Sequence, residues 1–172
     1  MEVFNNFWMK NILAIILTLT TVISYGQSDS NHFKLDDGIE LSWKIVKFER
    51  KNHTIGYCTD NSQKYLCKID NKEWFGSDRG NELPINQLVK LNLKIGSKNY
   101  QLETSQMFNP NSSGKLYTRQ FRIKKESGFY RLYAYFSDGA GTYTAYWKIL
   151  KNSSIRELIS TDEKDFEWQF EN

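Results

Sequence analysis

Hydrophobic and polar residues alternate over short runs through most of the chain, and turn-forming residues interrupt these runs about every ten positions. Alternation with a period of two puts one side of each run in a core and the other toward solvent, as in a β-strand. The pattern therefore predicts an all-β fold, an antiparallel β-sandwich or small barrel of about eight or nine strands. The expected strands are residues 38–48, 54–58, 64–69, 88–95, 99–103, 115–123, 129–136, 142–150 and 155–159.

The expected strand 129–136 is apolar or aromatic on both sides. Its even-numbered side chains, Leu132 to Phe136, are expected in the core, so that its tyrosines face outward together with Tyr146 of the next strand. An exposed tyrosine patch rimmed by Arg131 and Lys148 would suit a protein interface or a sugar ring. The alternative is aromatic pairing across the strands that only stabilises the sheet. The binding residues predicted in this hairpin are Arg131, Tyr133, Tyr135, Ser137, Asp138, Gly141, Tyr143 and Tyr146.

The first residues of the chain predict a secretory signal peptide. Lys10 precedes an apolar run from Ile12 to Ile23, and small residues at Ser24 and Gly26 fit cleavage by signal peptidase. An apolar run of roughly 12 residues is short of the 20 or so that span a membrane, so no transmembrane anchor is expected after processing. We expect an exported protein, periplasmic or extracellular. The predicted division is a signal peptide, residues 1–26, and a single all-β domain, residues 27–172.

The two cysteines predict a disulfide bond. Cys58 and Cys67 flank a polar centre between strand-like ends, which is typical of a β-hairpin with facing positions that can be bridged. An exported chain meets an oxidising compartment, where such a close pair forms a structural disulfide rather than a metal or catalytic site.

Charge and residue types argue against several classes of function. The formal net charge is +3, and its 23 basic and 20 acidic residues are interspersed, so no nucleic-acid partner is expected. The chain has two histidines, His32 near the expected mature N-terminus and His53 beside the expected disulfide hairpin, and neither their number nor their positions favour a Ser-His-Asp relay or a His-rich metal site. No catalytic residue, metal or cofactor is therefore predicted. Carboxylate pairs of the kind that hydrolyse glycosides are present but non-specific; the candidates are Asp78, Glu82, Asp138 and Glu157.

Several segments between and after the expected strands carry further expectations. The long connections 71–83 and 104–114 are alternative places for function, although their apolar residues would also close the end of a sandwich. Residues 84–87 begin with proline and predict a helical turn. Alternating aromatic residues at 166–170 predict a last edge strand.

The turn of the tyrosine hairpin resembles a loop of a known family. Ser137-Asp138-Gly139-Ala140-Gly141-Thr142-Tyr143 is similar to the Ser-Gly-x-Tyr and Ser-Gly-x-x-Tyr loops of bacterial periplasmic lysozyme inhibitors. Matching Gly141 and Tyr143 puts Ala140 where the family has serine, unless Ser137 supplies the hydroxyl. The resemblance implies a small exported β-protein with a loop that enters the active-site cleft of a lysozyme.

Taken together, the sequence predicts an exported, non-enzymatic binding protein of the inhibitor or immunity type. It would block a protein partner, such as a cell-wall hydrolase, through the tyrosine-rich hairpin. The first alternative is a carbohydrate- or peptidoglycan-binding module that uses the same tyrosines for stacking. The second is a carboxylate-based cell-wall hydrolase.

Overall fold

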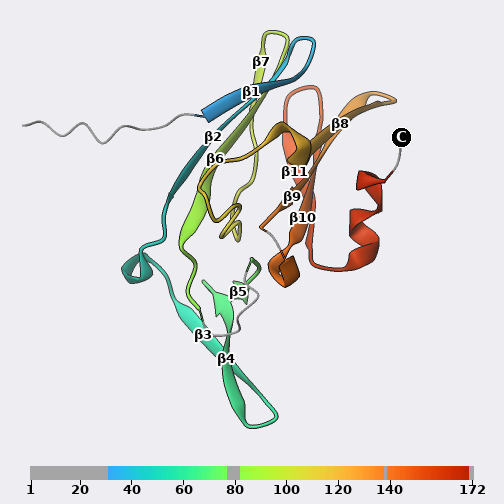
Figure 1. Ribbon diagram of the computed structural model, residues 1–172. Helices are drawn as coiled ribbons and strands as arrows, with labels where there is room; N and C mark the ends of the chain where they lie inside the picture. The colour runs from blue at the N-terminus through green and yellow to red at the C-terminus, as the bar shows by residue number, and fades with distance from the viewer. Residues whose placement is uncertain (1–30, 77–81, 138, 171–172) are drawn as a thin grey trace, which may run out of the picture.

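The computed structural model describes residues 31–76, 82–137 and 139–170, and the predicted signal peptide lies outside them. The fold is all-β, with three antiparallel sheets (Figure 1). Two sheets have four strands each, in the orders β1-β2-β6-β7 and β11-β10-β9-β8, and the third has the order β3-β4-β5. The strands are β1 (Asn31–Asp36), β2 (Ile39–Lys47), β3 (Ile55–Asp60), β4 (Gln63–Ile69), β5 (Lys72–Glu73), β6 (Asn86–Ile95), β7 (Lys98–Gln101), β8 (Phe121–Glu126), β9 (Phe129–Phe136), β10 (Tyr143–Ile149) and β11 (Ser154–Ser160).

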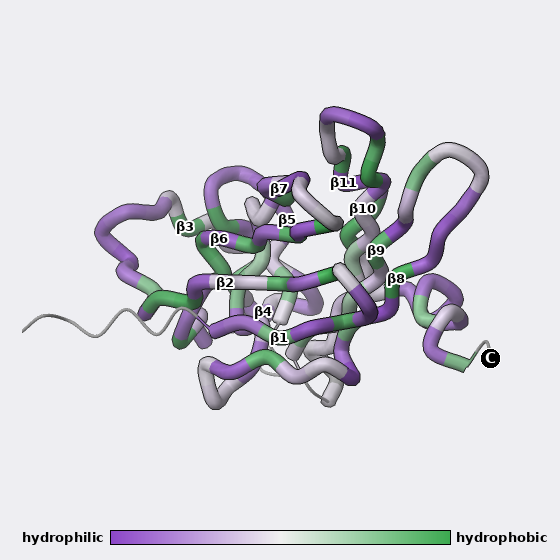
Figure 2. Tube along the Cα trace, turned by 90° about the horizontal axis from the view of Figure 1, so that it is seen from above, coloured by the Kyte–Doolittle hydropathy of each residue, from purple (hydrophilic) through white to green (hydrophobic). Residues whose placement is uncertain are grey.

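The two four-stranded sheets pack against each other and enclose the main core. Leu41, Leu91 and Leu93 from the first sheet and Leu132 and Trp147 from the second are completely buried in it. Figure 2 shows hydrophobic and hydrophilic residues following one another along these strands, as expected when one side of each strand faces the core. The predicted sandwich-like fold is confirmed.

The open corners of the sandwich are closed by side chains. At one corner, the rings of Phe33 in β1 and Phe121 in β8 are 5.6 Å apart. At the other corner, Ser154 Oγ donates a hydrogen bond of 2.9 Å to the carbonyl of Gln101, and Lys98 Nζ donates one of 2.7 Å to that of Lys151. These contacts satisfy carbonyl groups at the sheet margin and join the sheets without a backbone ladder.

Most predicted strands are confirmed, and the differences lie in polar or connecting segments. The sequence pattern missed β1. Residues 115–123 are not one strand, because a 3₁₀ turn at Thr118–Gln120 precedes β8. Gln120 explains this turn, since its buried amide donates a hydrogen bond of 3.1 Å to the carbonyl of Tyr135. The helical turn predicted at 84–87 is also wrong, because β6 begins at Asn86.

The predicted last edge strand is instead the 3₁₀ helix η5 (Glu163–Gln169). Asp162 caps its start by accepting a hydrogen bond of 3.1 Å from the backbone N–H of Lys164, and two carboxylates lie in its first turn. The helix packs on the outer face of the β8–β11 sheet (Figures 1 and 2). None of the helices in the described part of the chain is long and apolar enough to cross a membrane.

Candidate binding surface at the disulfide hairpin

Trp168 of η5 covers the outward face of the hairpin β9–β10. Its ring centroid is 5.5 Å from that of Tyr133 and 6.3 Å from that of Tyr135. Its Nε1 donates a hydrogen bond of 3.1 Å to the hydroxyl of Thr144, and both residues are buried. The sequence predicts an exposed tyrosine patch here; instead Tyr133, Tyr135 and Tyr146 are half-buried.

The tyrosines of this face are used to hold the C-terminal helix. The rings of Tyr133 and Tyr146, opposite each other in the sheet, are 4.9 Å apart. The Tyr146 hydroxyl donates to the backbone carbonyl of Asp165 in η5. Burial, together with the nearby Asp165 carboxylate, raises the pKa of Tyr146 to about 12. These contacts support the stabilising alternative, in which the aromatic pairs serve the fold.

Tyr143 lies in the core and not on the binding loop predicted for it. It is completely buried, and its ring stacks on Phe136 at 5.4 Å. Its hydroxyl donates a hydrogen bond of 3.0 Å to the carbonyl of Phe108. Burial raises the pKa of Tyr143, so the hydroxyl stays protonated and keeps this bond. Its position follows from the sheet register, because Tyr143 faces the buried Phe136 across the strands.

Arg131 stands on the same outward face as the tyrosines but is engaged within the sheet. Its guanidinium pairs with Glu126, and with Glu157 at 3.0 Å, and lies over the ring of Phe129. Lys148 Nζ also lies over Phe129, 4.4 Å from the ring centroid. The predicted cationic rim is thus present, but its arginine is paired with two carboxylates.

The predicted loop at the turn of this hairpin is tied to the end of the sandwich. The Ser137 N–H donates a hydrogen bond of 2.9 Å to the carbonyl of Pro110, and the Ser137 hydroxyl donates one of 3.4 Å to that of Gly76. Gly141 ends a 3₁₀ turn, and Asp138 lies outside the described residues. The structure therefore brings Arg131, Tyr133, Tyr135 and Tyr146 together on one face but separates them from Ser137, Gly141 and the buried Tyr143.

The hairpin β3–β4 is the feature that projects from the sandwich (Figure 1). The predicted disulfide Cys58–Cys67 is confirmed and joins its two strands, with Cα atoms 5.7 Å apart. Tyr57 is 47% exposed and Tyr65 37% exposed. The ammonium group of Lys64 lies 4.6 Å from the centroid of the Tyr57 ring. The hairpin thus presents two tyrosines and a cation on a cross-linked support.

The base of the hairpin is fixed by a second, small core. Phe48, Ile69 and Phe108 are buried together there, apart from the main core. The His53 ring stacks on Phe48 with centroids 4.6 Å apart and meets Phe108 edge to face at 5.7 Å. Phe108 belongs to the long connection 104–114, so this loop closes the end of the sandwich. The partly buried residues packed against the small core are Ile55, Trp74 and Leu83.

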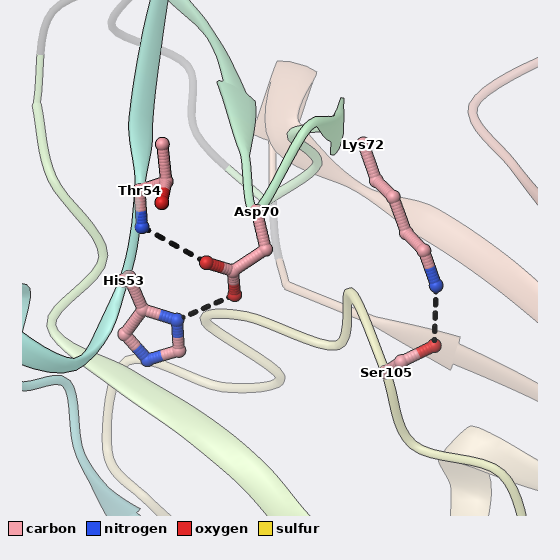
Figure 3. Close-up of polar contacts among 5 residues, drawn as sticks. All are labelled: His53, Thr54, Asp70, Lys72 and Ser105. Carbon is pink, nitrogen blue, oxygen red and sulfur yellow. Dashed lines mark hydrogen bonds and ion pairs between the residues drawn. The ribbon is translucent and has the colours of Figure 1, made fainter.

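Asp70 joins the two strands of the hairpin at this base (Figure 3). One carboxylate oxygen is 2.7 Å from Nδ1 of His53, and the other accepts a hydrogen bond of 2.9 Å from the backbone N–H of Thr54. Partial burial opposes the charged form of Asp70. The hydrogen bonds from His53 and Thr54 outweigh that effect, and the pKa of Asp70 is lowered.

We expect the Asp70 carboxylate to make stability depend on pH in the acid range. Because its pKa is lowered in the folded state, its contribution is complete above the unfolded value, 3.8, and is lost as pH falls through the folded value. Asp70→Asn should therefore lower the free energy of unfolding at about pH 6 and reduce the further loss as pH falls below about 4. Urea unfolding at several pH values measures this. Asp60→Asn, at the hairpin turn, is the control; an equal effect from both changes would contradict the prediction.

A cleft of about 250 Å³ lies beside the hairpin base. One wall comes from β6, where Val89 is the extra residue of a β-bulge and is 40% exposed. Another wall comes from residues 104–108, where Gln106 has a positive φ of 65°. The lining residues are His53, Ile69, Asp70, Lys72, Gln87, Leu88, Val89, Thr104, Ser105, Gln106, Met107 and Phe108.

The polar groups in and behind the cleft form two separate sets. Ser105 Oγ is 3.5 Å from Lys72 Nζ and accepts a hydrogen bond of 3.1 Å from Arg156, while His53 bonds to Asp70 on the other side (Figure 3). No hydrogen bond among the described residues links Ser105 to His53, so His53 is not placed as a base for Ser105. In the described ranges, no group of three or more His, Cys, Asp or Glu side chains could hold a metal ion.

Tyr57 and Tyr65 were not predicted as site residues, although the disulfide hairpin that carries them was. Tyr57 lies between Gly56 and Cys58, and Tyr65 between Lys64 and Leu66, so their immediate neighbours carry no clear signal of exposure. The pairing of His53 with Asp70 had no sequence signal, because the two residues are 17 positions apart.

Comparison with known proteins assigns the chain to no family. No protein-family model matches it, and neither does any curated protein or solved structure.

Proposed function

We propose that the chain is an exported protein of the inhibitor or immunity type that binds a partner protein through the hairpin β3–β4. The projection of this hairpin from the sandwich carries the proposal (Figure 1), because the side chains of Tyr57 and Tyr65 on it are exposed. The proposed contact surface therefore differs from the hairpin β9–β10 predicted from the sequence, because Trp168 covers the tyrosine face of that hairpin.

The physical chemistry of the projecting hairpin suits a protein interface. Tyrosine combines a large apolar ring with a polar tip and loses little conformational entropy on binding, which is why it is enriched at interfaces. The Cys58–Cys67 bridge and the small core at the base hold the two strands before binding. A support that is ordered in advance reduces the entropy cost of association.

The proposal is tested by affinity capture from an envelope and culture extract with oxidised protein, residues 27–172. Tyr57→Ala/Tyr65→Ala should lose a protein that the wild type holds. Tyr117→Ala is the matched control, because Tyr117 is 43% exposed and also lies beneath a cation, Arg119, but is far along the chain from the hairpin. The captured protein is then purified and its affinity for each variant is measured by calorimetry.

The outcomes separate this proposal from the other functions. Equal capture by the wild type and the double variant would contradict a hairpin interface. Sedimentation of the wild type with insoluble peptidoglycan, without any captured protein, would favour the wall-binding alternative. Loss of capture with Tyr57→Ala/Tyr65→Ala alone, and not with Tyr117→Ala, supports the proposal.

A further inference from the structure

Strand β3 has an open backbone edge. It pairs with β4 on one side only, since the sheet order is β3-β4-β5. The two-residue turn has positive φ at Asn61 and Ser62, so the flanking pair Asp60–Gln63 is hydrogen-bonded, and pairs alternate from there. The N–H and C=O groups of Thr59 and Tyr57 therefore point away from β4. Within the described ranges, no turn or loop backbone makes a hydrogen bond to either residue.

The outer strands of the two four-stranded sheets are covered, and β5 pairs with the end of β4 at Lys68 and Ile69. The β1–β8 corner is packed with aromatic rings, and the β7–β11 corner is joined by hydrogen bonds such as that from Ser154 to the Gln101 carbonyl. Edge strands are usually protected by lysine, proline or a covering element, because an open edge pairs with other chains. The sequence of β3, Ile55 to Asp60, contains neither lysine nor proline.

The region around the open edge has a net positive charge as large as that of the whole protein. Residues 47–68 include five Lys or Arg and two Asp or Glu, which gives +3, equal to the formal net charge of the full chain. All five cations are exposed. They are Lys47, Arg50, Lys51, Lys64 and Lys68.

We propose that β3 binds an acidic, extended segment of the partner as an added β-strand. This inference rests on the proposed function and specifies what the hairpin recognises. The outward N–H and C=O groups of Tyr57 and Thr59 would pair with the partner's backbone, and the exposed rings and lysines would contact its side chains. The surrounding charge selects an acidic segment, and it opposes pairing of β3 with a second copy, because two regions of +3 would meet.

The test removes one outward N–H and leaves the hairpin intact. Thr59→Pro deletes the Thr59 N–H, which makes no bond to β4, so the hairpin should still fold. Thr59→Ala keeps the N–H and is the control. We expect Thr59→Pro to bind the captured partner at least about tenfold more weakly, from lost hydrogen bonds, and Thr59→Ala to bind as the wild type does. Amide NMR spectra establish that both variants are folded.

A defined probe replaces the partner in a second arm. The probe is a blocked hexapeptide of alternating glutamate and valine, compared with its lysine–valine counterpart, both at millimolar concentration. We expect the acidic peptide alone to slow hydrogen exchange at the Tyr57 and Thr59 amides. Added salt should weaken this protection, because the contact is electrostatic.

The two proposals fail in different ways. If Thr59→Pro binds the partner like the wild type, strand addition is overturned, whereas loss of binding with Tyr57→Ala/Tyr65→Ala would still support the hairpin interface. Equal protection by the two peptides would overturn the preference for an acidic segment. A last outcome is protection of the Thr59 amide without partner or peptide, to a degree that rises with protein concentration. In that case a second copy of the chain pairs with β3, and the proposal is overturned.

Discussion

Replacing Trp168 with alanine is expected to lower the free energy of unfolding by about 3 to 5 kcal/mol, the usual cost of removing a buried tryptophan. Trp168 is only 6% exposed. It packs on Tyr133 and Tyr135, and its loss also leaves the buried Thr144 hydroxyl without the indole donor. Urea unfolding followed by circular dichroism gives the change in free energy.

Phe170 provides a matched control for the loss of Trp168. It lies at the end of the same helix but is 83% exposed, so Phe170→Ala should change stability by no more than about 0.5 kcal/mol. A second measurement is the pKa of Tyr146, about 12 in the folded protein, which should fall toward 10 when Trp168 no longer covers that face. If the two substitutions have equal effects and this pKa does not move, η5 does not pack on the sheet.

The strands could be predicted because their side-chain pattern reports directly on the core. In β9 and β10 the residues that alternate inward, such as Leu132, Phe136 and Trp147, are completely buried. Period-two alternation in β2 gives the same result for Leu41. The strand β1 was missed because it is short: only two apolar residues, Phe33 and Leu35, mark its inner side, which is half-buried, while the other side is exposed.

The exposure of the tyrosine face could not be predicted, because alternation gives the side of a strand and not what covers it. Trp168 comes from an element about 30 residues after Tyr135, and its aromatic neighbours also fit a strand pattern. The choice between strand and helix at residues 163–169 depends on Asp162, which caps the helix, and on the apolar surface that receives Trp168. Both are interactions that emerge only when the sheet has formed.

The candidate site was predictable in part. The spacing of Cys58 and Cys67 indicates the hairpin and its bridge, and the structure confirms both. Its projection from the sandwich depends on how the small core around Phe48 and Ile69 seats the base, which involves contacts between distant segments. The interface is therefore found by combining a local sequence feature with a tertiary arrangement.

The Cys58→Ser/Cys67→Ser variant is expected to lose about 2 to 3 kcal/mol of stability, by the loop-entropy argument for a short bridged loop. The bridge joins residues nine positions apart in a hairpin whose turn end is exposed. Without it, few apolar contacts hold β3 to β4 beyond the base, and a two-stranded hairpin alone is marginally stable. We expect amide hydrogen exchange to accelerate in β3 and β4 much more than in β9 and β10.

The same variant should also weaken partner binding, since an unbridged hairpin must be ordered at the moment of association. Wild-type protein treated with a reducing agent is the control, because it removes the bridge without changing a residue, and it should behave like the variant in both stability and binding. Unchanged exchange rates in β3 and β4 would mean that the small core around Phe48, Ile69 and Phe108 orders the hairpin by itself. Faster exchange with unchanged affinity would instead contradict the argument that the partner requires an ordered hairpin.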